Sequence, residues 1–240
     1  MSVVPYRDQS DSKKSQVAQM FNSIAHRYDF LNHFLSAGID HYWRRRAVDE
    51  LVAVKPRRVL DVATGTADLA IAALWADPEH IIGIDISEGM LAVGRQKLTE
   101  RHLTDRITLQ QGDSEALTFA DDSFDAITAA YGVRNFEHLD RGLAEMFRVL
   151  RPGGKLVILE FSKPRAFPLK QLYHGYFQYV LPRFGKLISK DASAYTYLPA
   201  SVQAFPDGEA FLVHLRRAGF QAVRWQPLTF GISSLYTATK

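Results

Sequence analysis

The chain has 240 residues, of which 47% are hydrophobic, and a formal net charge of +3. This length fits one α/β domain, and the hydrophobic content is too high for a disordered chain. The absence of cysteine excludes disulfides, thiolate nucleophiles and cysteine-based metal sites. A charge of +3 is too small to argue for a nucleic-acid partner. The sequence lacks both an apolar run of about 18 residues and the apolar core of a signal peptide, so we expect a cytoplasmic protein without a membrane span.

The N-terminal part of the chain predicts helices over 16–51, with a break near Gly38 and Asp40 as the cap of the second helix. Apolar runs then predict strands at 58–62, 81–85, 106–111, 124–130 and 155–161. Helical patterns lie between them, near 67–76, 88–101 and 137–150. Residues 151–154 are predicted to form a turn before the fifth strand. Strands that alternate with helices predict a parallel sheet with right-handed crossovers.

The alternation of strands and helices stops after residue 162. A segment rich in proline and aromatic residues continues to about residue 206, and a helix near 208–218 precedes strands at 220–226 and 230–239. We therefore divide the single predicted domain into an N-terminal helical cap (1–54), a core (55–161), an insertion (162–206) and a C-terminal helix with strands (207–240).

Acidic side chains follow the first two predicted strands. Asp61 ends the first strand, Gly65 allows a sharp turn and close approach of a ligand, and Asp85 ends the second strand. In nucleoside-binding α/β proteins, an acid at the tip of the second strand binds the ribose hydroxyls. The loop lacks the three glycines and the lysine of phosphate-binding motifs, and Asp61 would repel a pyrophosphate. A nucleoside cofactor without phosphate, S-adenosylmethionine, fits better.

Two further strand ends complete this candidate cofactor site. Asp113 and Ser114 follow the third strand, and Ala130 ends the fourth. The Asp113 carboxylate could accept a hydrogen bond from an adenine amino group, although a simple turn acid is an equally good interpretation. Ligands of open α/β sheets bind at these carboxyl ends, so the four strand ends together are more specific than any one of them.

At this point the chain resembles the ubiquinone/menaquinone biosynthesis C-methyltransferases, which are class I S-adenosylmethionine-dependent enzymes. The segments that carry the resemblance include RYDFLNHFLSAG, VLDVATGTADLA, GIDISEGML, YGVRN and LEFSKP. The resemblance implies a Rossmann-like, seven-stranded, mostly parallel sheet with N-terminal helices and a helical insertion before the last strands. The cofactor contacts that we expect are Asp61, Gly65, Thr66, Asp85, Ile86, Asp113, Ser114 and Ala130. The chain departs from the usual family pattern at Ala67, Asp113 and Ala130, where Gly, Asn and Ser are common.

The resemblance also implies methyl transfer to a ring carbon of a polyprenylated quinol, such as demethylmenaquinol or a 2-methoxy-6-polyprenyl-benzoquinol. The acceptor must be reduced, because a quinone ring is electron-poor, and losing a hydroxyl proton makes the ring carbon nucleophilic. The enzyme therefore needs a base, or a cation that stabilises the phenolate. Guanidinium stays protonated, so we assign Arg134, with Asn135, to stabilising the quinolate. The remaining candidates are His26, Tyr28, Asp29, Asn32 and His33.

Among these candidates, His33 and Asp29 are our choices for the base. An ordinary surface or core side chain is the more common role of a lone histidine, and Arg134 and Asn135 could form a salt bridge and a helix cap. We predict no metal, since no cluster with metal-ligand spacing stands out.

Residues 161–190 contain seven aromatic residues, six Lys or Arg and no acid. Tyr173, Phe177 and Val180 would share one helical face, with Tyr176 and Tyr179 nearby. This composition suits peripheral contact with the inner face of a membrane, from which a polyprenyl substrate could be taken, but an ordinary lid helix fits equally well. A nucleic-acid surface is not favoured, because no recognition motif accompanies the patch. The alternative functions are methyl transfer to another phenolic or lipid acceptor, and a non-catalytic scaffold of a quinone-synthesis complex.

Overall fold

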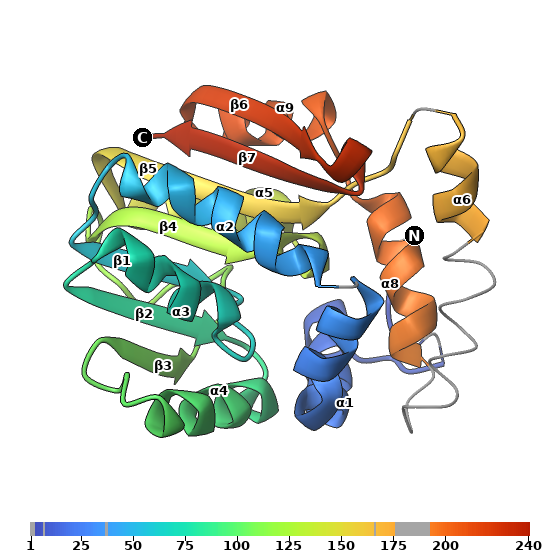
Figure 1. Cartoon of the computed structure of the whole chain (residues 1–240), viewed down its shortest axis with the longest axis horizontal. Coiled ribbons are helices and arrows are strands. Elements are labelled where there is room, and N and C mark those ends of the chain that lie inside the picture. Colours follow the sequence, from blue (N-terminus) through green and yellow to red (C-terminus); the bar gives the residue numbers. More distant parts are fainter. Residues whose placement is uncertain (1–2, 7, 37, 166, 176–192) are drawn as a thin grey trace.

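A twisted sheet of seven strands runs through the protein, with helices on both faces (Figure 1). The computed structural model describes residues 3–6, 8–36, 38–165, 167–175 and 193–240. The strands are β1 (Arg58–Val62), β2 (His80–Asp85), β3 (Ile107–Gln111), β4 (Phe124–Ala130), β5 (Leu150–Phe161), β6 (Gln221–Leu228) and β7 (Ser233–Thr239). The helices are α1 (Lys13–Leu35), α2 (Ile39–Val52), α3 (Asp68–Ala73), α4 (Glu88–Glu100), α5 (Leu139–Val149), α6 (Leu169–Gly175), α8 (Ser193–Ala204) and α9 (Glu209–Arg217). Short 3-10 turns are η1 (Leu74–Ala76), η2 (Val133–Asn135) and η4 (Thr229–Gly231).

The strand order is β3-β2-β1-β4-β5-β7-β6. Strands β1 to β5 are all parallel to one another, and β7 pairs antiparallel with both β5 and β6. The prediction of an α/β fold with a seven-stranded, mostly parallel sheet is therefore confirmed. The order reverses between β1 and β4, which places a crevice for a ligand at the carboxyl ends of these strands.

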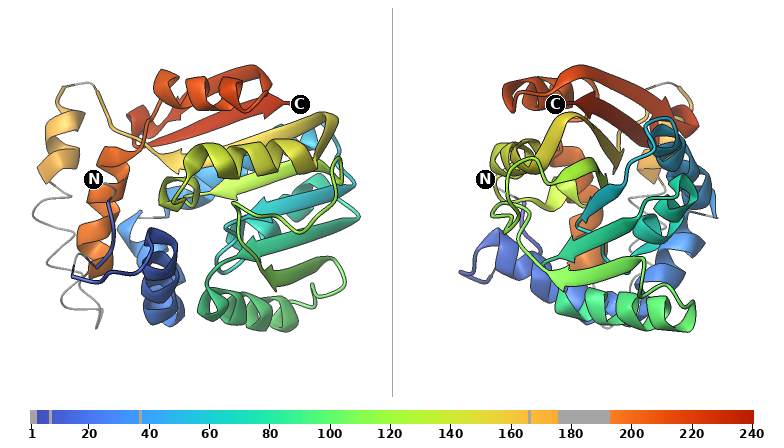
Figure 2. Two further views of the ribbon diagram at one scale, coloured as in Figure 1. Left: turned by 180° about the vertical axis from the view of Figure 1, so that it is seen from behind. Right: turned by 90° about the vertical axis from the view of Figure 1, so that its left-hand side faces the viewer.

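Two layers of helices explain why the central strands are apolar along their whole length. On one face α2, α3 and α4 bury residues such as Trp43 and Leu91, and on the other α5 and α9 bury Leu143 and Phe211 (Figure 2). Strand β1 is buried at every position after Arg58. Parallel strands that are covered on both faces consist of continuous apolar runs, which is why their positions could be predicted from the sequence.

Helices α1 and α8 lie beyond the carboxyl ends of the parallel strands (Figures 1 and 2). Val17 and Met20 of α1 form a small buried cluster with Tyr197 of α8. The N-terminal cap and the insertion thus meet at the edge of the sheet where the candidate cofactor residues lie.

The predicted role of Asp40 as a helix cap is wrong. Helix α2 begins after Gly38, which has a left-handed conformation (φ +76°) and caps the helix without a side chain. Asp40 lies inside the first turn, where it is buried and accepts hydrogen bonds from Ser36 Oγ at 2.6 Å and Arg44 Nη1 at 2.5 Å. The predicted break at Gly38 is correct, because glycine adopts this conformation at little steric cost.

Two strand boundaries differ from the prediction by three residues or more. Strand β5 begins at Leu150, and the expected turn at 151–154 is an irregularity within it: Leu150 pairs with Phe124, while Lys155 pairs with Ala126. Strand β7 begins at Ser233 rather than 230, because the preceding residues form η4, with Phe230 at φ +58°.

The predicted insertion contains α6 and α8, with residues 176–192 between them outside the described part. Tyr176, Phe177, Tyr179 and Val180 of the predicted aromatic face therefore lie outside the described residues, and only Tyr173 lies in α6. Within the described residues, no helix combines the length and hydropathy needed to span a bilayer.

Candidate functional site

A cleft opens at the carboxyl ends of β1, β2 and β4, beneath α1. It encloses about 670 Å³ of empty space, including its open mouth. Six of the predicted cofactor residues line it: Gly65, Asp85, Ile86, Asp113, Ser114 and Ala130. The other two, Asp61 and Thr66, line an adjoining cavity of about 390 Å³ that shares Tyr28, Gly65 and Ala130 with the cleft. The structure thus brings together all eight residues.

The Asp85 carboxylate is held by backbone N–H groups at the base of the cleft. One oxygen accepts a hydrogen bond from Gly65 N and the other from Ser87 N, both at 2.8 Å. Burial raises the pKa of Asp85, while the backbone N–H groups of Ser87, Gly65 and Ile86 oppose this shift. A carboxylate has about four acceptor positions, so those not used by the backbone remain for ribose hydroxyls. The free acceptor positions of this carboxylate therefore fit the ribose of a nucleoside cofactor.

The loop after β1 has left-handed backbone at Ala63 (φ +54°), Gly65 (φ +58°) and Ala67 (φ +69°). A Cβ atom at Gly65 would come within 3.3 Å of Met90 Cε, so glycine suits both the conformation and the space. Ala67, which replaces the usual glycine, is fully buried in the core and does not line the cleft or the adjoining cavity. Its cost to the protein is therefore backbone strain rather than lost space for a ligand.

Asp61 connects the loop to the neighbouring strand. Its two oxygens accept hydrogen bonds from Thr128 Oγ1 and Thr64 Oγ1, both at 2.6 Å, and it is 1% exposed. Burial raises the pKa of Asp61 to about 6, although the two threonine hydroxyls oppose the shift. Asp61 therefore shapes the loop in addition to lining the smaller cavity.

Helix α1 supplies contacts to the cleft that the sequence did not indicate. Lys14 Nζ lies 2.6 Å from Asp113 Oδ2, so the predicted adenine contact already pairs with a cation. Asn22 Oδ1 accepts hydrogen bonds from Ser87 Oγ at 2.7 Å and Gly89 N at 2.8 Å. The residues in these contacts are separated by 65 to 99 positions along the chain, so no local sequence pattern predicts the contacts.

The predicted base Asp29 also connects α1 to the core. Its Oδ1 accepts a hydrogen bond from Thr66 Oγ1 at 2.5 Å, and its Oδ2 pairs with Lys97 Nζ at 2.6 Å. Lys97 pairs in turn with Asp68 at 2.6 Å. Both carboxylate oxygens of Asp29 are therefore engaged by residues of the core. These contacts favour a tethering role for Asp29.

The other candidates on α1 are differently placed. Tyr28 lines both the cleft and the smaller cavity, and burial raises its pKa, so the phenol stays protonated at neutral pH. Asn32 hydrogen-bonds Tyr28 and lines the smaller cavity. His26 is exposed. The side chain of His33 lies outside the described part of the structure, so its role stays a prediction.

Arg134, in η2, forms a buried ion pair with Glu160 at the end of β5. Arg134 Nη1 lies 2.8 Å from Glu160 Oε1, and the two side chains are 5% and 0% exposed. The guanidinium also donates to the Tyr131 carbonyl oxygen and lies over the Phe161 ring. Burial alone would lower the pKa of Arg134, but the charge and hydrogen bond of Glu160, together with Tyr28 and Tyr197, outweigh this effect and raise the pKa. Both the predicted salt bridge and a stabilising cation are thus compatible with this arrangement.

The predicted site did not include Glu160, although the sequence contains a pattern that could have identified it. It ends the apolar run LVILE near the carboxyl end of its strand, as Asp61 and Asp85 do near the ends of theirs. It lies next to Ala130 in the sheet, because Ala130 pairs with Leu159.

Comparisons with known proteins identify the family of this chain. The model of the ubiE/COQ5 methyltransferase family matches residues 9–240. A protein of Bacteroides fragilis named demethylmenaquinone methyltransferase is 53% identical, with 99% of this chain and 97% of the relative covered. One of the same name from Deinococcus radiodurans is 48% identical, covering 98% and 97%. A ubiquinone/menaquinone biosynthesis C-methyltransferase UbiE of Geotalea daltonii is 48% identical, covering 95% and 97%.

Solved structures show the fold. The [4+2]-cyclase SpnF has a TM-score of 0.68 at 19% identity, covering 95% of this chain and 96% of that one. A structure from Thermotoga maritima, described as a S-adenosylmethionine-dependent methyltransferase and possible histamine N-methyltransferase, has a TM-score of 0.63 at 20% identity, covering 92% and 98%. A cyclase and a methyltransferase share this architecture, so the fold alone does not define the reaction. The match to the family model over residues 9–240 is more specific than the fold: the chain belongs to the ubiE/COQ5 methyltransferase family.

Proposed function

We propose that this protein transfers a methyl group from S-adenosylmethionine to a ring carbon of a polyprenylated quinol, with demethylmenaquinol as its substrate. Relatives that are 53% and 48% identical over almost the full chain are named demethylmenaquinone methyltransferases. The relative named UbiE supports a second acceptor, a 2-methoxy-6-polyprenyl-benzoquinol. The observation that carries the proposal is the buried Arg134 cation beside a cleft whose carboxylates suit a nucleoside.

The cleft residues account for cofactor binding. Asp85 would hold the ribose hydroxyls, Asp113 and Ser114 the adenine, and the loop from Asp61 to Thr66 the methionine end. When bound, S-adenosylmethionine supplies an electrophilic methyl group on a sulfonium. Because this group is reactive without further activation, the protein contributes mainly alignment and exclusion of water.

The acceptor side of the reaction needs stabilisation of negative charge. In the net reaction a ring C–H bond of the quinol becomes a C–CH₃ bond, and one proton is released to solvent. Electron density for the new bond comes from a quinol oxygen that gives up its proton. Arg134, fixed by Glu160, provides a positive charge for that oxygen at the carboxyl ends of β4 and β5. Asn135 lines the cofactor cleft from the next position in the chain.

A second cavity, of about 690 Å³, is lined by Val133 and Arg134 of η2. Most of its lining is apolar: Val3, Val133, Phe136, Leu139, Phe205 and Pro206. An apolar cavity adjoining the charged residue suits a prenyl tail whose ring lies at Arg134.

A prenylated substrate resides in a membrane, which supports peripheral association at the inner membrane face. Phe30 is 62% exposed, Tyr42 52% and Phe167 81%. Lys170 of α6 is exposed close to Phe167 in the chain. Co-sedimentation with anionic vesicles, compared with neutral vesicles and with high salt, tests this association.

The experiment that tests the function is methyl transfer from labelled S-adenosylmethionine to chemically reduced demethylmenaquinol and to the 2-methoxy-6-polyprenyl-benzoquinol, side by side. We expect label in the menaquinol product. Label in both products would make the enzyme active in two pathways. If neither product is labelled while calorimetry shows cofactor binding, the quinol assignment is wrong and another phenolic acceptor or a scaffold role must be tested.

A further inference from the structure

Three buried side-chain atoms near the ends of β4 and β5 have no hydrogen-bond partner in the described part of the structure: Arg134 Nε, Asn135 Oδ1 and Tyr197 Oη. Tyr197 is 3% exposed, Asn135 8%, and the Arg134 side chain 5%. A buried polar atom without a partner costs about 1–3 kcal/mol, so such atoms are rare in native proteins. Arg134 and Asn135 are consecutive residues, and Tyr197 belongs to a helix that contacts their turn, so the three atoms point to a polar group that completes their hydrogen bonding.

The three residues come from parts of the chain that meet only in the fold. Arg134 and Asn135 belong to η2, and Tyr197 belongs to α8, which packs beside η2. The charges of Arg134 and Glu160 both act on the Tyr197 hydroxyl, and Arg134 acts in the same way on Tyr28, which lines the cofactor cleft. Asn135 itself lines the cofactor cleft, so the three residues lie beside that cleft.

The three atoms are complementary to one quinol hydroxyl. Arg134 Nε–H can only donate, Asn135 Oδ1 can only accept, and the Tyr197 hydroxyl can donate. A phenolic hydroxyl donates one hydrogen bond and accepts up to two. It would donate to Asn135 Oδ1 and accept from Arg134 and Tyr197, which satisfies all three atoms at once.

We propose that Tyr197 is a catalytic residue that contacts the acceptor, donating a hydrogen bond to the quinol ring oxygen beside Arg134. This inference rests on the proposed function and extends the acceptor site to the insertion. Burial raises the pKa of Tyr197 to about 12, so its hydroxyl remains protonated and available as a donor at neutral pH. As negative charge develops on the quinol oxygen, this hydrogen bond strengthens, so it favours the transition state over the ground state.

The test compares Tyr197→Phe with Tyr236→Phe as a matched control. Phenylalanine keeps the ring that packs on Val17 and Met20. The Tyr236 hydroxyl is also buried, but it accepts a hydrogen bond from Gly208 N at 2.8 Å. We expect Tyr197→Phe to lower kcat by about 10- to 100-fold on demethylmenaquinol, with little change in KM.

Three further measurements separate a catalytic from a structural role. For Tyr197→Phe we expect an unchanged or raised Tm, an unchanged Kd for S-adenosylmethionine in calorimetry, and a kcat profile displaced to higher pH. The displacement follows because a lost donor raises the pKa of the bound quinol hydroxyl. For Tyr236→Phe we expect a lowered Tm and an unchanged kcat.

A parent-like kcat and pH profile in Tyr197→Phe would overturn the inference and leave the proposed function standing. It would indicate that trapped water satisfies the three atoms. A lowered Tm together with weaker cofactor binding would also overturn it, in favour of a structural role. If the parent protein methylates neither quinol, both the proposed function and this inference fail.

Discussion

The buried ion pair between Arg134 and Glu160 allows a direct test of how the acceptor side is held together. Glu160 Oε1 accepts hydrogen bonds from Arg134 Nη1 and Phe161 N, both at 2.8 Å, and Oε2 accepts from Arg134 N at 3.1 Å. Glu160→Gln keeps the shape but replaces one oxygen with an NH₂ group, which faces a donor. It also leaves the Arg134 cation buried without a counter-charge. Breaking a buried pair in this way costs about 3–5 kcal/mol.

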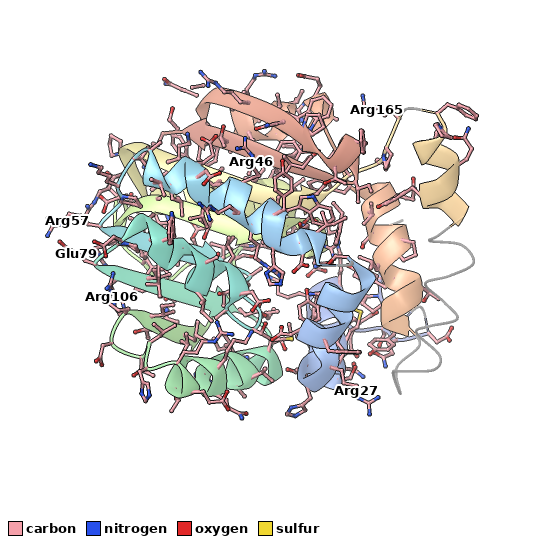
Figure 3. The ribbon with its side chains drawn as sticks, viewed as in Figure 1. Arg27, Arg46, Arg57, Glu79, Arg106 and Arg165 are labelled. Atoms are coloured by element: carbon pink, nitrogen blue, oxygen red, sulfur yellow. The ribbon has the colours of Figure 1, made fainter. Side chains whose placement is uncertain are left out.

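The exposed pair Arg57–Glu79 is a matched control at the sheet edge opposite the cofactor cleft (Figure 3). Its atoms are 2.5 Å apart, but the side chains are 73% and 59% exposed. Solvent screens such a pair, so Glu79→Gln should leave the free energy of unfolding almost unchanged.

Urea unfolding of the parent and both variants measures these differences. We expect a large decrease of the midpoint for Glu160→Gln and almost none for Glu79→Gln. The double variant Arg134→Gln/Glu160→Gln should lose less free energy of unfolding than the sum of the two single variants. Two facing amides can hydrogen-bond to each other, whereas each single variant leaves one buried charge without a counter-charge. A loss below about 1 kcal/mol for Glu160→Gln would refute the reasoning, since it would mean that water reaches the pair.

Three other predictions follow from the cleft and its surroundings. Asp85→Asn should weaken S-adenosylmethionine binding about 100-fold in calorimetry, because it removes charge-assisted hydrogen bonds to the ribose; parent-like affinity would displace Asp85 from the cofactor site. The folded-state pKa of Asp61, about 6, lies above its unfolded value, so the folded protein binds the extra proton between about pH 4 and 6. The free energy of unfolding should therefore fall as pH rises through this window, by up to roughly 3 kcal/mol, and an Asp61→Asn variant with an unchanged slope would contradict this assignment. Ala204→Trp, at the rim of the apolar cavity, should raise KM for long-tailed quinols and leave KM for a short-tailed analogue unchanged, whereas equal effects on both would argue against a prenyl site there.

The sequence predicted the sheet and the base of the cleft for a physical reason. Strands covered on both faces must be apolar along their length, so a polar residue such as Asp61 or Asp85 marks the end of the strand. Because carboxyl ends of adjacent parallel strands meet at one edge, residues that mark such ends necessarily lie together. Glu160 obeys the same rule and could have been found by applying it to the fifth strand.

Contacts made by α1 and α8 could not be predicted in this way. Asp29 meets Thr66, and Tyr197 lies near Arg134, only because both helices lie across the strand ends. The helical pattern predicts which face of a helix is apolar, but not where the helix docks. The cap of α2 failed for a related reason: Asp40 fits a capping position by residue type, but its carboxylate is used by Arg44.

The way in which α1 is attached has a consequence for the rate of cofactor exchange. This helix forms one wall of the cleft, and Lys14, Asn22 and Asp29 hold it there through polar contacts. Partly exposed ion pairs contribute roughly 0.2–1 kcal/mol each, and salt weakens them. Helix α1 also buries Val17 and Met20 in a small cluster with Tyr197, whereas α2 packs into the larger core through fully buried side chains such as Leu51. We therefore expect α1 to move away from the cleft more readily than the core unfolds. The demethylated cofactor should then leave faster at high ionic strength, and turnover at saturating substrate should depend on salt.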